Sequence, residues 1–236
     1  MTDPALLLVA HGTRNPRGVE MIARLADAVS GRVGATRVAF VDVLGPSPSE
    51  VLREIAGPVV LVPAFLASGY HVHADVPREV ADSGHGRVLV TPALGPDPVL
   101  ARVLVQRLRE AGWRPGDAVV LAAAGSSDPR ALHDVHRAAD MLSALTHRTV
   151  SVGYVATGEP RVPQVVEELR ERGARRVFVA SYLLAEGLFH SRLSGAGADG
   201  VTAPLGVTAP VVELVARRYY AAVPALRASA GVRPAR

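Results

Sequence analysis

The sequence contains no cysteine and no lysine, and each absence removes a class of chemistry. Without cysteine there is no disulfide and no thiolate metal site, so a transition metal must be held by histidine, aspartate or glutamate. All 26 cationic residues are arginine, which excludes a Walker phosphate loop, a Schiff-base lysine and a pyridoxal phosphate enzyme.

Long hydrophobic runs are also missing, since none approaches the roughly 20 residues that span a bilayer. The first ten residues have no basic region and no cleavage site of small residues, so we expect no signal peptide and a cytosolic protein. The formal net charge of +4 is modest and the arginines are spread along the chain. This pattern favours an anionic small ligand over nucleic acid or a membrane as partner.

Short apolar runs alternate with amphipathic helical patterns along the chain. The run at 5–10 is continuous, as in a strand covered on both faces, and a helical pattern follows over 16–30. This alternation predicts parallel sheets with helices on both faces. Further strands are expected at 36–43, 58–66, 87–91, 117–123, 149–155, 176–181 and 201–203, and further helices at 47–55, 75–81, 97–111, 129–145, 162–172 and 209–222.

The second half of the sequence repeats the first. The segment HGTRNPR at 11–17 aligns with AGSSDPR at 124–130, and FVD at 40–42 aligns with YVA at 154–156. Offsets that stay between about 110 and 120 residues indicate an internal duplication.

We therefore predict an α/β protein of two tandem similar domains, each a small parallel sheet with helices on both faces, with a cleft between them. The first domain is expected at 1–112 and carries the functional site. The second, at 117–224, is a degenerate copy, and 225–236 is expected to be a flexible tail.

Three polar residues of the first half each lie just past a predicted strand: His11, Asp42 and His71. Their counterparts in the second half are Ala124, Ala156 and Phe189. Core packing does not explain why three polar residues are replaced together in the second half. A single functional site kept only in the first half explains it. Two imidazoles and a carboxylate suit Co²⁺, Ni²⁺, Fe²⁺ or Zn²⁺, and ligands bind at the carboxyl edge of open parallel sheets.

Two histidines, His71 and His73, compete for this site. On an extended loop over 67–73 they would point in opposite directions, so only one is expected to face the metal. We choose His71, because Gly69 permits a sharp turn that would expose it, and we expect His73 on the rim.

The motifs AHGTRNPRG, FVDVLGPSPSE and VPAFLASGYHVHADVP resemble those of class II chelatases, the sirohydrochlorin ferrochelatases and anaerobic cobalt chelatases. The resemblance covers nearly the whole chain, in the long form with two fused halves. It implies two α/β domains facing each other across a cleft, with a tetrapyrrole between them. It also implies metal insertion without ATP and no permanently bound cofactor, the divalent metal (Co²⁺, Fe²⁺ or Ni²⁺) being a substrate.

Carried over by position, His11 and His71 would bind the incoming metal and accept pyrrole protons. Asp42 stands where the family usually has a glutamate, so its reach as a third ligand is one methylene shorter. Sirohydrochlorin carries several carboxylates, which arginine binds well. The substrate-binding candidates are Thr13, Arg14, Arg17, His73 and Arg78.

Two other functions use the same residues. A non-catalytic carrier of metal or tetrapyrrole would need the ligands but no proton acceptor, and an α/β ligand-sensing module would need no metal. The sequence does not distinguish iron from cobalt, or siroheme from cobalamin biosynthesis. Two fused halves could close a cleft within one chain, so we expect a monomer.

Overall fold

Each half of the chain contributes one four-stranded parallel sheet in the computed structural model, which describes residues 3–229. The strand orders are β2-β1-β3-β4 and β6-β5-β7-β8. In both sheets the first strand in sequence, β1 or β5, therefore lies between the second and the third. This confirms the predicted α/β class with two similar sheets. The strands are β1 (Ala5–Ala10), β2 (Thr36–Phe40), β3 (Val59–Pro63), β4 (Val88–Val90), β5 (Ala118–Gly125), β6 (Ser151–Thr157), β7 (Val177–Tyr182) and β8 (Gly200–Val201).

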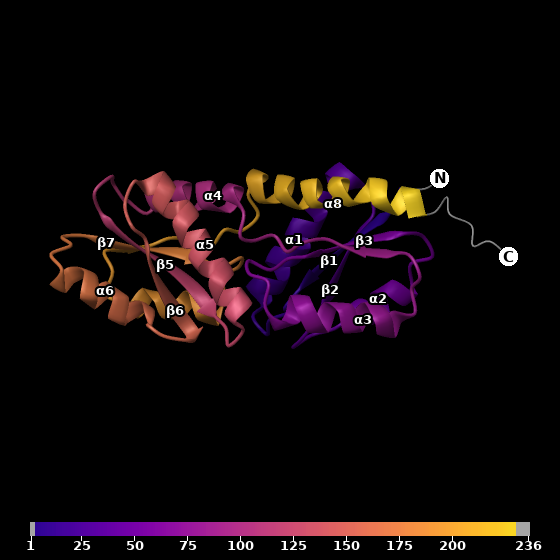
Figure 1. Cartoon of the computed structure of the whole chain (residues 1–236), viewed down its shortest axis with the longest axis horizontal. Helices are drawn as coiled ribbons and strands as arrows, with labels where there is room; N and C mark the ends of the chain where they lie inside the picture. Colours follow the sequence, from indigo (N-terminus) through magenta and orange to yellow (C-terminus); the bar gives the residue numbers. More distant parts are fainter. Residues whose placement is uncertain (1–2, 230–236) are drawn as a thin grey trace. The chain divides into compact units, whose positions relative to one another are not determined.

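Helices cover both faces of each sheet (Figure 1). In the first sheet, α2 and α3 pack on one face, where Leu7 and Val9 of β1 meet Val51, Leu52 and Val76. The opposite face is covered by α1 and α8. The helical elements are α1 (Pro16–Val33), α2 (Pro48–Arg53), η1 (His71–Asp75), α3 (Val76–Ser83), α4 (Pro98–Glu110), α5 (Pro129–Thr146), α6 (Val162–Glu171), α7 (Leu188–Arg192), η2 (Leu193–Gly195) and α8 (Ala209–Ser229).

The two halves use the same backbone devices. Helix α1 begins at Asn15, whose side chain accepts the backbone N–H of Arg17 at 3.0 Å, and α5 begins in the same way at Asp128. Such N-caps satisfy helix N–H groups that have no partner within the helix. The N–H of Phe40 donates to the carbonyl of Pro46, and that of Tyr154 donates to Pro160, both at 2.9 Å. The duplication is therefore visible in local hydrogen bonds as well as in strand order.

The compact units do not coincide with the two sequence repeats. Helix α4 follows the first sheet in sequence but belongs to the second unit, and α8 follows the second sheet but belongs to the first. In the first unit the buried hydroxyl of Tyr219 on α8 donates to the carbonyl of Pro4 at 2.7 Å, and Arg218 donates to the carbonyls of Ala93 and Leu94. The expected division at 1–112 and 117–224 thus differs from the packing, because sequence adjacency does not decide which sheet an amphipathic helix covers.

Two local expectations differ from the structure. The predicted flexible tail at 225–236 begins too early, because α8 continues to Ser229 and buries Leu226 at 5 % exposure; residues 230–236 lie outside the described part. The predicted extended loop over 67–73 gives way to the π-helical turn η1 at its end. Among residues 3–229, no helix is long and apolar enough to cross a lipid bilayer.

Candidate functional site

His11 lies at the carboxyl end of β1, where the central strand leaves the first sheet. The next residue, Gly12, has φ +94°, and a Cβ there would overlap the backbone oxygen of Asp42. The carbonyl of His11 accepts the N–H of Asp42 at 3.1 Å. A glycine is therefore required for the chains leaving β1 and β2 to run this close together, and the turn leaves the His11 side chain exposed.

His71 is the first residue of η1 and its imidazole faces that of His11. The ring centroids are 4.4 Å apart and the planes are inclined by 70°. Phe65 stacks on the His71 ring at 6.1 Å, and Tyr70 meets it edge-on at the same centroid distance. The structure thus brings together two of the three predicted metal ligands, with aromatic rings beside them.

A buried carboxylate holds the other side of the His71 ring. Nδ1 of His71 lies 2.6 Å from Oδ2 of Asp75, whose residue is only 6 % exposed. The second oxygen of Asp75, Oδ1, is 2.8 Å from Nη2 of Arg78. Neither contact was predicted, because 67–73 was expected to be an extended loop. The signal was present in the spacing, since residues three and four apart share one face of a helix.

Asp42 does not complete a three-ligand set. Its residue is exposed, and Oδ1 accepts the N–H of Val43 at 2.7 Å. Val43 has φ +68°, an uncommon conformation for a β-branched residue. Within residues 3–229, no group of three or more His, Asp or Glu side chains is arranged to hold a metal ion. Ligation by Asp42 together with both histidines stays a prediction.

The predicted substrate-binding residues differ in their exposure and in the partners of their side chains. The hydroxyl of Thr13 accepts the N–H of Asn15 at 3.1 Å and so shapes the turn into α1. Arg14, Arg17 and His73 are exposed. Arg78 is 56 % exposed at its side chain and is paired with the carboxylate of Asp75, and its contact with a substrate stays a prediction.

His71 and His73 both lie on the π-helical turn η1, and not on the extended loop that was expected. Gly69 lies outside the left-handed region of φ, and His71 begins the π-helical turn η1. The two histidines lie on a helical turn, where a separation of two residues also places side chains on roughly opposite sides. His73 is the exposed one of the pair.

The matching edge of the second sheet carries no imidazole pair. Ala124 lies within the last residues of β5 at the position of His11, and Phe189 on α7 takes the position of His71 with 40 % exposure. The next residue, His190, directs Nε2 to the carbonyl of Thr202 at 2.9 Å. The difference between the halves is therefore concentrated in the side chains at this edge.

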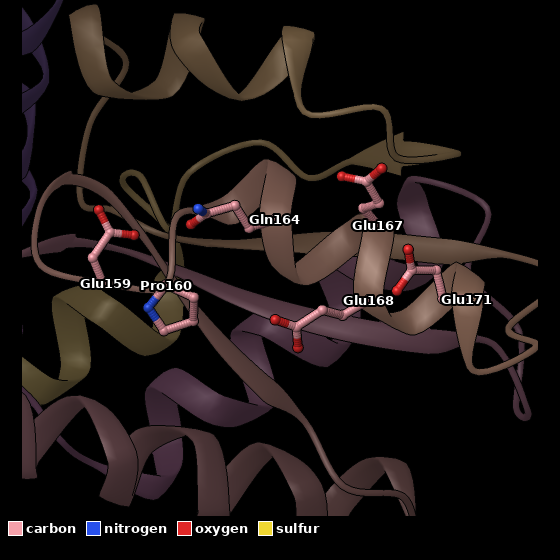
Figure 2. A pocket seen from close by; sticks show the side chains of 6 residues that line it. All are labelled: Glu159, Pro160, Gln164, Glu167, Glu168 and Glu171. Carbon is pink, nitrogen blue, oxygen red and sulfur yellow. The ribbon is translucent and has the colours of Figure 1, made fainter.

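An open acidic groove lies elsewhere, in the second unit (Figure 2). Its glutamates project from α6 and from the turn before it, and it shares no residue with the histidine pair. It lacks imidazole and arginine, the groups that a metal-inserting site for an anionic ligand requires. The groove is lined by Glu159, Pro160, Gln164, Glu167, Glu168 and Glu171.

Comparison with known families gives a match to the CbiX family model over residues 5–111 and again over 118–222. The two matched segments correspond to the two sequence repeats and together cover most of the chain. The resemblance carried by the sequence motifs is thereby confirmed.

Curated relatives have the same two-repeat extent or half of it. A sirohydrochlorin ferrochelatase of Priestia megaterium is 24% identical over an alignment of 202 residues that covers 80% of this chain and 76% of the relative. A sirohydrochlorin cobaltochelatase of Methanothermobacter thermautotrophicus is 29% identical over 130 residues, covering 45% of this chain and 91% of the relative. The second protein therefore corresponds to a single repeat.

A similar solved structure is that of SirB from Bacillus subtilis with Fe³⁺. It superimposes with a TM-score of 0.81 at 20% identity and covers 96% of this chain and 98% of its own. At this identity the likeness establishes the fold, including both sheets.

Proposed function

The chain belongs to the CbiX family, and from this premise we propose that it is a chelatase that inserts a divalent metal ion into sirohydrochlorin. The observation that carries the proposal is the pair of facing imidazoles at the edge of the first sheet, 4.4 Å apart between ring centroids. The metal, Fe²⁺ or Co²⁺, is a substrate of the reaction, which needs no ATP.

The first task of such an enzyme is to hold a metal ion that it must later release. Metal–nitrogen bonds of about 2 Å allow one nitrogen from each of two rings this close to reach a common ion. Two imidazoles leave the remaining coordination positions to water and to the incoming macrocycle.

The second task is to remove protons from the pyrrole nitrogens as the metal enters. Imidazole binds and releases protons near neutral pH, which suits a general base at this point. We assign this role to the two histidines, His11 on its exposed turn and His71 on η1. Each ring binds the ion before transfer and takes a proton afterwards.

The third task is to bind the carboxylates of the substrate. Arg14 and Arg17 are exposed on the turn and first residues of α1, close in sequence to His11. Guanidinium groups bind carboxylates in a bidentate manner, so these two arginines are the proposed anchors for the macrocycle's side chains.

An anaerobic insertion assay tests the proposal. Sirohydrochlorin in excess over protein is mixed with Fe²⁺, Co²⁺ or Ni²⁺ at equal free concentrations, and the Soret band is followed against a protein-free control. We expect many turnovers per protein with at least one metal. Uptake that stops at one equivalent would identify a carrier, and a rate equal to the protein-free control would overturn the proposal.

A further inference from the structure

We infer that Asp75 is a positioning residue that fixes the tautomer and orientation of His71, so that Nε2 of this ring is the atom offered to the metal ion. The inference rests on the proposed function only in naming a metal ion as the ligand. The arrangement of the three side chains concerned, His71, Asp75 and Arg78, is observed in the structure.

The contact between His71 and Asp75 determines where the imidazole proton lies. Oδ2 of Asp75 is 2.6 Å from Nδ1 of His71, and an ionised carboxylate can only accept a hydrogen bond. Nδ1 must therefore carry the proton. In a neutral ring this leaves Nε2 with a free lone pair, the form that binds a metal.

Asp75 is itself held firmly. The residue is 6 % exposed, and its other oxygen forms an ion pair with Nη2 of Arg78 at 2.8 Å. A buried carboxylate with a partner at each oxygen has little freedom to rotate, so the ring bonded to it is confined as well. The backbone supports this arrangement, because the π-helical turn is closed by the N–H of Val76 donating to the carbonyl of His71.

A purely structural role for Asp75 is not evident from its contacts. Asp75 lies at the N-cap of α3, yet its side chain makes no capping hydrogen bond to that helix. Its carboxylate is directed instead to the His71 ring and to Arg78. The side chain therefore contacts the imidazole and a guanidinium of α3, and it does not cap the backbone N–H groups of that helix.

The second half of the chain has lost the same three groups together. With His71 aligned to Phe189, the positions of Asp75 and Arg78 fall on Leu193 and Ala196, which are buried at 2 % and 4 % exposure. Where the imidazole is absent, its acceptor and the arginine that holds the acceptor are absent too. This joint loss indicates that the carboxylate and arginine belong to the function of the histidine.

The primary test reads the tautomer directly and does not depend on catalysis. Histidine side chains labelled with ¹⁵N are observed by NMR in metal-free protein, in mildly alkaline buffer where imidazoles are neutral. In the wild-type protein we expect His71 to carry its proton on Nδ1. In Asp75→Asn, whose amide can donate as well as accept, we expect a mixture of tautomers. Asp82→Asn is the matched control, because this exposed residue of α3 loses the same charge without contacting the ring.

A second measurement uses Co²⁺ alone as the probe. Removing the hydrogen-bond partner of a ligating histidine weakens metal binding by about 10- to 100-fold, so we expect a loss of this size in Asp75→Asn and none in Asp82→Asn. Arg78→Gln keeps Asp75 but removes one of its partners, and we expect a smaller loss. Because the side chain of Arg78 is exposed, we expect Arg78→Gln to fold. Thermal unfolding followed by circular dichroism checks the fold of all three variants.

The outcomes separate the inference from the proposed function. A wild-type His71 protonated on Nε2 overturns the inference even if Asp75→Asn fails to fold. The same tautomer and the same Co²⁺ affinity in Asp75→Asn and Asp82→Asn also overturn it. Failure of the wild-type protein to insert metal into sirohydrochlorin counts against the function alone, because the tautomer is read without substrate.

Discussion

The two sheets of this protein share a backbone and differ in the side chains at one edge. Thr13 and Ser126 accept the N–H two residues later, at 3.1 and 3.0 Å, and the following helices each have 18 residues. Yet only the first sheet ends in two facing imidazoles, His11 and His71. Fold and chemistry therefore have separate determinants: local hydrogen bonds and apolar packing maintain the scaffold, and a few strand-end side chains make the site.

The largest expected effect comes from removing the imidazoles of the first half. His11→Ala and His71→Ala each take away a metal ligand and a proton acceptor, so we expect the rate of metal insertion to fall by at least about 10²-fold. His133→Ala, on the exposed face of α5 in the second half, should leave the rate unchanged. The Soret assay measures all three. Insertion by both site variants at the wild-type rate would remove the distinction between the halves.

The next largest effects are expected at two glycines in equivalent positions of the two halves, where stability and metal insertion can be measured separately. Gly12 and Gly125 have φ +94° and +93°, and a Cβ would overlap the backbone oxygen of Asp42 in one case and of Thr157 in the other. Alanine at either position should lower the free energy of unfolding by about 1–3 kcal/mol, measured by urea denaturation. Gly31→Ala, within α1 and with nothing near the new Cβ, should instead stabilise the protein by up to about 1 kcal/mol.

The same two variants should differ in metal insertion. Gly12 lies beside His11, so its replacement displaces an imidazole as well as straining the turn. Gly125 follows Ala124, whose methyl side chain can neither bind a metal ion nor accept a proton. At a temperature where both variants are folded, we expect insertion to be reduced in Gly12→Ala only. An equal reduction in both would show that the second edge contributes directly.

The smallest expected effect is on stability, and it concerns the first residues of β3 in the first sheet and of β7 in the second. In the first sheet the N–H of Val59 donates to the backbone carbonyl of Arg87, whereas in the second the N–H of Val177 donates to Oδ2 of Asp199 at 2.8 Å. This bond, followed by the nearby guanidinium of Arg170, lowers the pKa of Asp199 from its usual value. Only the second sheet therefore has an acid-sensitive bond at this place.

Asp199→Asn should lower the melting temperature slightly near neutral pH. A carboxyl with a lowered folded-state pKa contributes stability above its unfolded pKa, about 3.9, and loses that contribution as the pH falls through the folded value. The difference between wild type and variant should thus be full at neutral pH and shrink below about pH 4. A difference that stays constant down to acidic pH would assign the effect to packing.

Much of the site was predictable because strand ends are readable in the sequence. The continuous apolar run of β1 places His11 at the sheet edge, and the duplicated motif shows that the second half lacks its counterpart. The helical turn at His71 was not predictable, because 67–73 has glycine and no amphipathic period. Its consequence, the contact of His71 with Asp75, was missed for the same reason.

The sequence by itself determined the approximate strand positions, the parallel character of the sheets and the repeat, since these follow from alternating apolar and helical patterns and from residues that match at nearly constant offsets. Only the tertiary structure decided that α4 covers the second sheet and α8 the first, and that the ring of His71 is bonded to Asp75. The physical reason is that helix placement and side-chain direction depend on packing between residues distant in sequence, which no local pattern records.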